Sequence, residues 1–232
     1  MRKFAIYLLL LASCAAQLLM AQQSGQTLDR PAQPGLIFGD DGDQVQIVPK
    51  QEAAAAISLP KKNHGGEAMK AIQQVPIFWG KGWAESDAHA RQTALADVLA
   101  GNASTSGELQ SHAIKTLRAA PSLNDFSDLS ATTVNDLAIQ HKLVDLLQTN
   151  AIPKPGANTL YVIYLAPGVS SSIGGNKAGT DYLAYHNVVN VEAGPVHYVV
   201  VPYSDDATTH RAAAARACSE AGMNPNVISG WF

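Results

Sequence analysis

Residues 159–165 read Thr-Leu-Tyr-Val-Ile-Tyr-Leu, an unbroken run of apolar and mostly β-branched or aromatic side chains. Such a run is typical of a strand that is buried on both faces, because a strand with one wet face would alternate polar and apolar residues. A run of similar character at 196–201 is predicted to pair with residues 188–191 in a hairpin. A shorter apolar run at 76–79 predicts one more strand.

Four helices are predicted around these strands. They cover residues 86–100, a stretch within 106–119, residues 133–148, and residues 208–221, where Gly222 is the expected stop. The third helix is expected to start with a capping box from Thr133 to Asp136 and to bury a stripe of four apolar residues: Val134, Leu137, Val144 and Leu147. The order of strand, three helices, three strands and helix predicts an α/β fold, with α+β as the alternative. We expect a small mixed sheet packed by about four helices.

The first 21 residues have the build of a secretory signal peptide. Arg2 and Lys3 precede an apolar stretch that runs to Met20 and ends at a small residue, Ala21. A second interpretation is a lipoprotein signal, because Leu-Ala-Ser-Cys at 11–14 resembles a lipobox and would leave a lipid on Cys14. Plain secretion is favoured, because the residues after Cys14 stay apolar where a lipoprotein usually turns polar. The expected location is secreted or periplasmic, with a lipid anchor through Cys14 as the alternative, and no later stretch is long enough to span a membrane.

Residues 22–74 predict a low-complexity linker, because they are rich in Gln, Gly and Ala and contain four prolines. Within it, Leu36-Ile37-Phe38 and Val45-Gln46-Ile47-Val48 flank an aspartate-rich turn and form a candidate hairpin. The spacing of those aspartates does not fit an EF-hand. The folded domain is expected to span residues 75–232.

Composition and cysteine content narrow the class of protein. Apolar residues make up 47% of the 232, enough for a core, and 16 basic against 19 acidic residues give a net charge of −3. A nucleic-acid partner is therefore not expected, since there is no basic surplus to neutralise phosphates. Of the two cysteines, Cys14 belongs to the signal segment. Cys218 is expected to be a small buried apolar residue.

The usual catalytic patterns are missing. The loop at 168–177 is rich in Gly and Ser, but it matches neither a phosphate-binding loop nor a nucleophile elbow. No histidine pair has the H-E-x-x-H spacing that places two zinc ligands on one helical face. His186 and His197 are expected to lie far apart along the predicted hairpin. The residues therefore predict no cofactor-binding residue, no metal ligand and no cofactor, and they leave any catalytic residue unknown.

A series of short segments resembles the exordium-like (phosphate-induced protein 1) family. The segment Ile77-Phe78-Trp79-Gly80-Lys81-Gly82-Trp83 is similar to the family's aromatic opening, and the match continues through residues 128–130, 151–153, 158–163, 167–169, 184–186 and 197–202. The resemblance covers residues 75–203 and rests on the order and spacing of these segments. It implies the family's α/β fold for the domain.

Bacterial members of that family carry a zincin-like H-E-x-x-E-A-x-T-D-P pattern on the last helix, and this chain departs from it. At the positions that match, the ligand histidine is Arg216, the general-base glutamate is Ala217 and the aspartate is Asn224, whereas Glu220 agrees. Arginine does not give up its proton to bind zinc, and alanine accepts none. His210 lies six residues too early to replace the missing ligand.

We therefore expect a secreted or envelope-associated protein without catalytic activity that binds an unidentified extracellular or envelope ligand. A secreted zinc-dependent, peptidase-like hydrolase with ligands elsewhere is the alternative. A third interpretation is a truncated gene product, because the chain ends at Trp231-Phe232 where family members continue.

Overall fold

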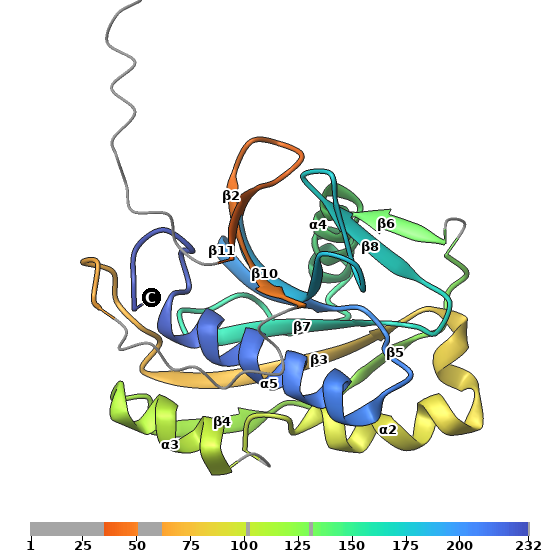
Figure 1. Cartoon of the computed structure of the whole chain (residues 1–232), viewed down its shortest axis with the longest axis horizontal. Coiled ribbons are helices and arrows are strands. Elements are labelled where there is room, and N and C mark those ends of the chain that lie inside the picture. The colour runs from red at the N-terminus through yellow and green to blue at the C-terminus, as the bar shows by residue number, and fades with distance from the viewer. Residues whose placement is uncertain (1–34, 51–61, 101–102, 130–131, 232) are drawn as a thin grey trace, which may run out of the picture. The chain divides into compact units, whose positions relative to one another are not determined.

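Eight strands form one mixed sheet in the order β1-β2-β10-β11-β7-β3-β4, with β5 paired to the second half of β3 (Figure 1). The computed structural model describes residues 35–50, 62–100, 103–129 and 132–231, so the predicted signal segment lies outside it. The strands of this sheet are β1 Leu36–Phe38, β2 Gln44–Pro49, β3 Ala71–Trp79, β4 Thr116–Ala119, β5 Leu123–Asp125, β7 Thr159–Leu165, β10 Tyr182–Val191 and β11 Gly194–Val201.

The run at 159–165 forms β7, the strand predicted from it, and all seven of its residues are buried. It lies between β3 and β11 and runs parallel to both, with Ile163 opposite Ile77 and Val200. The predicted hairpin is also confirmed, as the antiparallel pair β10 and β11. The mixed α/β class is therefore confirmed.

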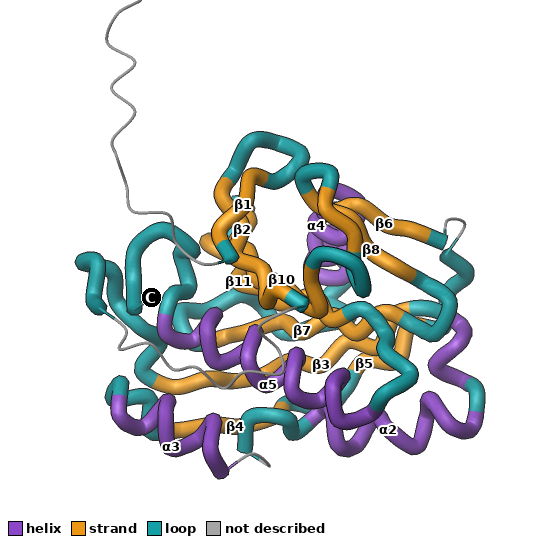
Figure 2. Tube along the Cα trace, viewed as in Figure 1, coloured by secondary structure: helices purple, strands orange, loops and turns teal. Residues whose placement is uncertain are grey.

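Helices and a second sheet cover the two faces of the main sheet. One face carries α2 (Ser86–Ala96), α3 (Ala103–Ser111) and α5 (Ala207–Met223), and the other carries α4 (Asp136–Gln148). Beside α4 lies a three-stranded sheet made of β6 (Thr133–Asn135), β8 (Ser170–Ile173) and β9 (Asn176–Lys177) (Figure 2). The described residues thus contain the four helices that the sequence predicts, together with a short 3-10 turn at Lys81–Ala84.

The second predicted helix is wrong in its second half. Helix α3 ends at Ser111, and the chain turns through Ala113, which has a φ of 65°. Residues Thr116–Ala119 then form strand β4, parallel to the start of β3. Pairing with a sheet edge here outweighs the weak helical preference of the local sequence.

Helix α4 begins later than its apolar pattern predicts, and it buries a different face. Its N-cap is Asn135, whose Oδ1 accepts a hydrogen bond from the Ala138 N–H at 2.9 Å, and Thr133 lies in β6 instead. The predicted stripe is wrong in part, because Leu137 is 49% exposed. Three apolar residues form the buried face: Ile139, Leu143 and Leu146. The same face holds two polar residues, Asp136 and Gln140, and this conceals it in the sequence.

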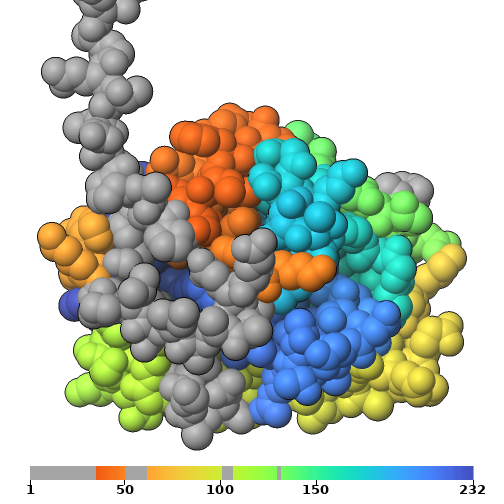
Figure 3. Space-filling model, in the orientation of Figure 1, coloured from red at the N-terminus to blue at the C-terminus, as the bar shows by residue number. Residues whose placement is uncertain are grey.

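The candidate hairpin in the predicted linker exists and belongs to the sheet. Strands β1 and β2 pair antiparallel, and β2 also pairs with β10, so that Val45 and Val48 are fully buried. The turn of the hairpin meets the β8–β9 turn, where the Gly174 N–H donates to Asp40 Oδ1 at 3.0 Å (Figure 3). The sheet therefore includes residues upstream of the expected boundary at 75, and β3 itself starts at Ala71. Residues 51–61 of the predicted linker lie outside the described part of the chain.

Helix α5 runs through the predicted stop at Gly222 and ends at Met223. Gly222 is needed for close packing, because a Cβ there would lie 2.5 Å from Cδ1 of Ile72 on β3. Alanines supply most of the rest of the buried face, which lets the helix lie close to the sheet: Ala213, Ala214, Ala217 and Ala221. In the described part of the chain, no helix is long and apolar enough to cross a bilayer.

Candidate functional site

The last two turns of α5 carry the residues that align with the zincin-like pattern and mostly depart from it. Arg216 donates from Nε to Oε1 of Glu220 at 2.9 Å, one helical turn further along. Glu220 is buried and the arginine is one third exposed. Ala217 and Cys218 between them are fully buried, and burial raises the pKa of the Cys218 thiol far above its usual value. Cys218 is thus the buried apolar residue that the sequence predicts.

These residues do not fit a zinc ion. The guanidinium of Arg216 carries a permanent positive charge and is paired with Glu220, the one carboxylate of the pattern. The charge of that carboxylate is therefore already neutralised by another side chain of the protein. Ala217, at the position of the general base, offers no group that could take up a proton. Positions 216 and 217 of this helix therefore supply neither a zinc ligand nor a general base.

His186 and His197 lie closer together than the sequence predicts. His186 is opposite Val199, and His197 is opposite Val188, so the two histidines are two residues apart in register and share the face of the sheet that packs on α5. The expectation that they lie far apart is wrong, because the hairpin extends to Tyr182 and brings His186 into the ladder.

Both histidines take part in a buried polar layer. His186 Nε2 lies 3.1 Å from Oε1 of Gln46 on β2, and the same oxygen accepts from Asn224 Nδ2 at 3.0 Å. His197 Nδ1 lies 3.0 Å from the carbonyl oxygen of Pro225. Burial lowers the pKa of His197, which keeps this imidazole neutral near pH 7.

His210 lies at the opposite end of α5, in its first turn, among three aromatic rings. The rings of Tyr203, Tyr164 and Trp83 are centred 5.3, 6.3 and 6.4 Å from the imidazole. Burial, together with the positive charge of Arg91, lowers the pKa of His210 to about 4. His186, His197, His210 and Glu220 therefore do not converge. Within the described ranges, no group of three or more His, Cys, Asp or Glu side chains is placed to hold a metal ion.

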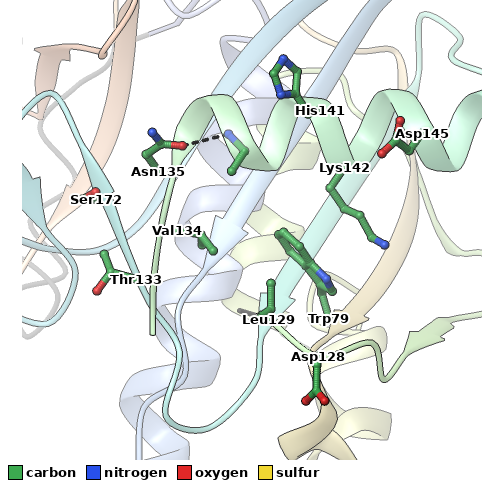
Figure 4. Close-up of a pocket in the computed structure, with 11 residues that line it drawn as sticks. Trp79, Asp128, Leu129, Thr133, Val134, Asn135, His141, Lys142, Asp145 and Ser172 are labelled. Atoms are coloured by element: carbon green, nitrogen blue, oxygen red, sulfur yellow. Dashed lines mark hydrogen bonds between the residues drawn. The ribbon is translucent and has the colours of Figure 1, made fainter. Parts of the chain in front are cut away.

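An open cavity of about 670 Å³ lies on the other face of the sheet, between α4 and the carboxyl end of β3. We call it the Trp79 pocket. Its apolar wall consists of Trp79, Leu129, Val134 and Ala138. Its polar wall includes Thr133 and Asn135 of β6, Ser172 of β8, and three side chains of α4: His141, Lys142 and Asp145 (Figure 4).

The topology of the sheet explains why a pocket forms there. From the end of β3 the chain passes through α2 and α3 on one face to β4 and β5, and then through α4 on the other face to β7. Strands β5 and β7 lie on opposite sides of β3. The connection that leaves β3 and the connection that leads to β7 therefore diverge at the carboxyl end of β3. In open α/β sheets this divergence leaves a crevice in which ligands bind.

Lys142 closes one side of the Trp79 pocket. Its ammonium group lies 2.5 Å from Oδ2 of Asp125 and 5.6 Å from the centre of the Trp79 ring, and Figure 4 shows it extending from α4 toward the indole. Burial raises the pKa of Asp125, but hydrogen bonds from Lys142 and Ser127 outweigh it and hold the pKa below its usual value. The carboxylate of Asp125 stays charged near pH 7, and its ion pair with Lys142 fixes the lysine side chain over the ring.

Asp136, at the start of α4, lies next to the wall residue Asn135 but points into the core. Its carboxylate accepts hydrogen bonds from the hydroxyls of Tyr185 and Tyr198 at 2.7–2.9 Å and from the side-chain amides of Gln140 and Asn187 at 2.9–3.1 Å. Burial raises the pKa of Asp136, although each of these hydrogen bonds acts in the opposite direction. The network fixes the helix that forms the wall of the Trp79 pocket onto β10 and β11.

Sequence reasoning missed the Trp79 pocket. The sequence places Trp79 at the end of a strand, in the core and in the resemblance, and Lys142 lies within a helix whose apolar face is predicted wrongly. The signal for the pocket is the order of the strands around β3, because the chain adds β5 on one side of β3 and then β7 on the other side. It becomes visible only once β5 and β7 are known to flank that strand.

Comparisons with known proteins do not assign the chain to a family. No family model matches it, and no curated protein matches it significantly. Among solved structures, metalloproteinase-II from Bacteroides fragilis is similar at a TM-score of 0.35 and 11% identity, covering 94% of this chain and 63% of that chain. The fold and site define a mixed α/β domain with a polar crevice at the carboxyl end of its parallel strands. The likeness to the metalloproteinase is too weak to add a function to that description.

Proposed function

We propose that this protein is a secreted or envelope-associated binding protein without catalytic activity, and that its ligand occupies the Trp79 pocket. The ion pair between Arg216 and Glu220 carries the proposal. It stands where the exordium-like resemblance would require a zinc ligand and its neighbours, and a fixed arginine there opposes a bound cation. The pocket at the divergence of β3 supplies a ligand site that needs no metal.

The secreted location rests on residues 1–21, and it has its own test. Mass spectrometry of exported protein should find an N-terminus near Gln22. A diacylated Cys14 as the first residue would replace free secretion by a lipid anchor and leave the binding role unchanged.

The experiment that tests the absence of catalysis restores the missing groups. The natural chain and the double variant Arg216→His/Ala217→Glu are compared for zinc affinity and for release of product from a casein substrate, each after loading with zinc. The natural chain should release no product, and the double variant should bind zinc more tightly than the natural chain. Product release by the natural chain, lost on chelation of zinc, would replace the binding role with the hydrolase alternative.

A further inference from the structure

The start of α5 is anchored to the core by a single side chain. Of residues 207–212, only His210 is buried, with 2% of its surface exposed. From Ala213 to Met223, by contrast, every residue except Arg216 is buried. Release of His210 would therefore free the first turn of the helix while the rest of α5 stays packed on the sheet.

His210 is buried without a polar partner. Among the described residues, neither of its ring nitrogens has a hydrogen-bond partner, and its neighbours are the rings of Trp83, Tyr164 and Tyr203. A protonated imidazole has two N–H donors, and here both would lack an acceptor. Arg91, over the Tyr203 ring at 5.2 Å from its centre, would add repulsion between like charges. The tyrosine hydroxyls carry no charge in acid, and the carboxylates of Asp205 and Asp206 are on exposed residues just before the helix.

The chain that leads into α5 is held by hydrogen bonds near the surface. Arg91 of α2, which contacts α5, donates from its two Nη atoms to the carbonyl oxygens of residues 204–205 at 2.8 and 2.9 Å (Figure 1). Asp206 caps the helix, because its Oδ1 accepts from the Thr208 N–H and its carbonyl oxygen accepts from the His210 N–H, both at 2.9 Å. The first turn is thus a small unit with one buried anchor and several bonds that water can replace.

We propose that the first turn of α5 is a latch, which acid opens when His210 takes up a proton. The open turn gives the imidazolium access to water and to the carboxylates of Asp205 and Asp206, and it uncovers the aromatic rings around the histidine. Burial and the charge of Arg91 lower the pKa of His210 to about 4, whereas the freed side chain has its usual value near 6.5. The opening should therefore become about 50-fold more frequent between pH 7 and pH 4.5.

Hydrogen exchange of the natural chain, followed by NMR, tests the latch. Hydrogen bonds from Thr209 and Thr208 lower the pKa of Asp206, so the helix cap stays ionised down to pH 4.5. Over this range the amides of residues 208–211 should lose about 50-fold in protection, after correction for the intrinsic effect of pH on exchange. Their exchange should not change in about 1 M urea, because a local opening exposes little surface. The amides of β7 should exchange more slowly at both pH values and respond to urea.

Two variants separate His210 from the other groups that titrate in acid. His210→Leu should keep the first turn protected at pH 4.5, whereas His89→Ala, an exposed change on α2, should show the same loss as the natural chain. If His210→Leu does not fold, NMR titration of the His210 ring in the natural chain decides instead, with an expected pKa of about 4.

Three results would overturn the latch. The first is protection of residues 208–211 that does not change with pH, or a His210 ring that titrates near pH 6.5. The second is exchange of these amides at the rate and with the urea dependence of β7, which would show that only global unfolding releases the histidine. The third is the same acid loss of protection in His210→Leu.

Discussion

Arg216 and Glu220 form an ion pair one turn apart on α5, with Nε and Oε1 separated by 2.9 Å, and the carboxylate is the buried partner. The arginine thus compensates a charge that would otherwise be costly to keep in the core. The pair also places a cation at the position where a zincin-like helix would need a neutral ligand.

Removing the arginine should destabilise the fold. Arg216→Ala leaves Glu220 buried without this partner, and we expect a loss of about 1–3 kcal/mol in the free energy of unfolding, measured in urea. The double variant Arg216→Ala/Glu220→Ala should lose less than the sum of the two single variants. Additive losses would show that the two side chains do not interact.

His210 should make stability depend on pH in the acid range. An unfolded histidine takes up a proton near pH 6.5, whereas folded His210 does so at about 4. As pH falls through this window the unfolded state gains a proton that the folded state lacks, so stability on the order of 3 kcal/mol is lost between pH 7 and 4.

His210→Leu should flatten that part of the curve of unfolding free energy against pH. His89→Ala, an exposed change on α2, is the control and should leave the curve as it is. An unchanged slope in His210→Leu would show that another group causes the acid loss.

Asp136 should make the free energy of unfolding depend on pH in the opposite direction. Its folded pKa is raised, so the folded state keeps the proton where the unfolded state has released it, and the stability this gives is present at low pH and lost as pH rises from about 4. Asp136→Asn should remove this contribution while keeping partners for the two tyrosines. Asp136→Leu removes the acceptor shared by the two hydroxyls and the two amides, leaving Gln140 and Tyr198 only each other, and should cost about 3 kcal/mol or more in urea unfolding. Equal stability of the two variants would contradict a hydrogen-bonded role for the carboxylate.

The buried face of α4 can be tested with two leucines. Leu143 is fully buried and Leu137 is half exposed. Leu143→Ala should cost about 2–5 kcal/mol, and Leu137→Ala should stay within about 0.5 kcal/mol of the natural chain. Calorimetric melting of both variants measures this, and the reverse order would restore the stripe that the sequence predicts.

Strand β7 and the β10–β11 hairpin could be predicted from the sequence because their burial leaves a continuous apolar run. Strand β4 could not, since Thr116–Ala119 is mostly exposed and is held in place by pairing with β3. The register of α4 was missed for a different reason. Asp136 and Gln140 look like solvent-facing residues until the buried hydroxyls of Tyr185 and Tyr198 are found beside them.

Less of the candidate site than of the fold could be predicted from the sequence. The replacement of the zinc-binding pattern by Arg216 and Ala217 is visible in the sequence, and the structure adds the pairing with Glu220. The Trp79 pocket is assembled from β3, β6, β8, α4 and the segment after β5, whose residues show no common spacing. Only the order of the strands brings them together.

The central claim is that helix α5 carries no metal chemistry, and zinc titration calorimetry of the natural chain tests it most directly. The account predicts no stoichiometric zinc site, and it predicts the same heats for His210→Ala as for the natural chain. A site for one equivalent of zinc in the natural chain that disappears in His210→Ala would contradict the account and make the zinc-dependent hydrolase the better description.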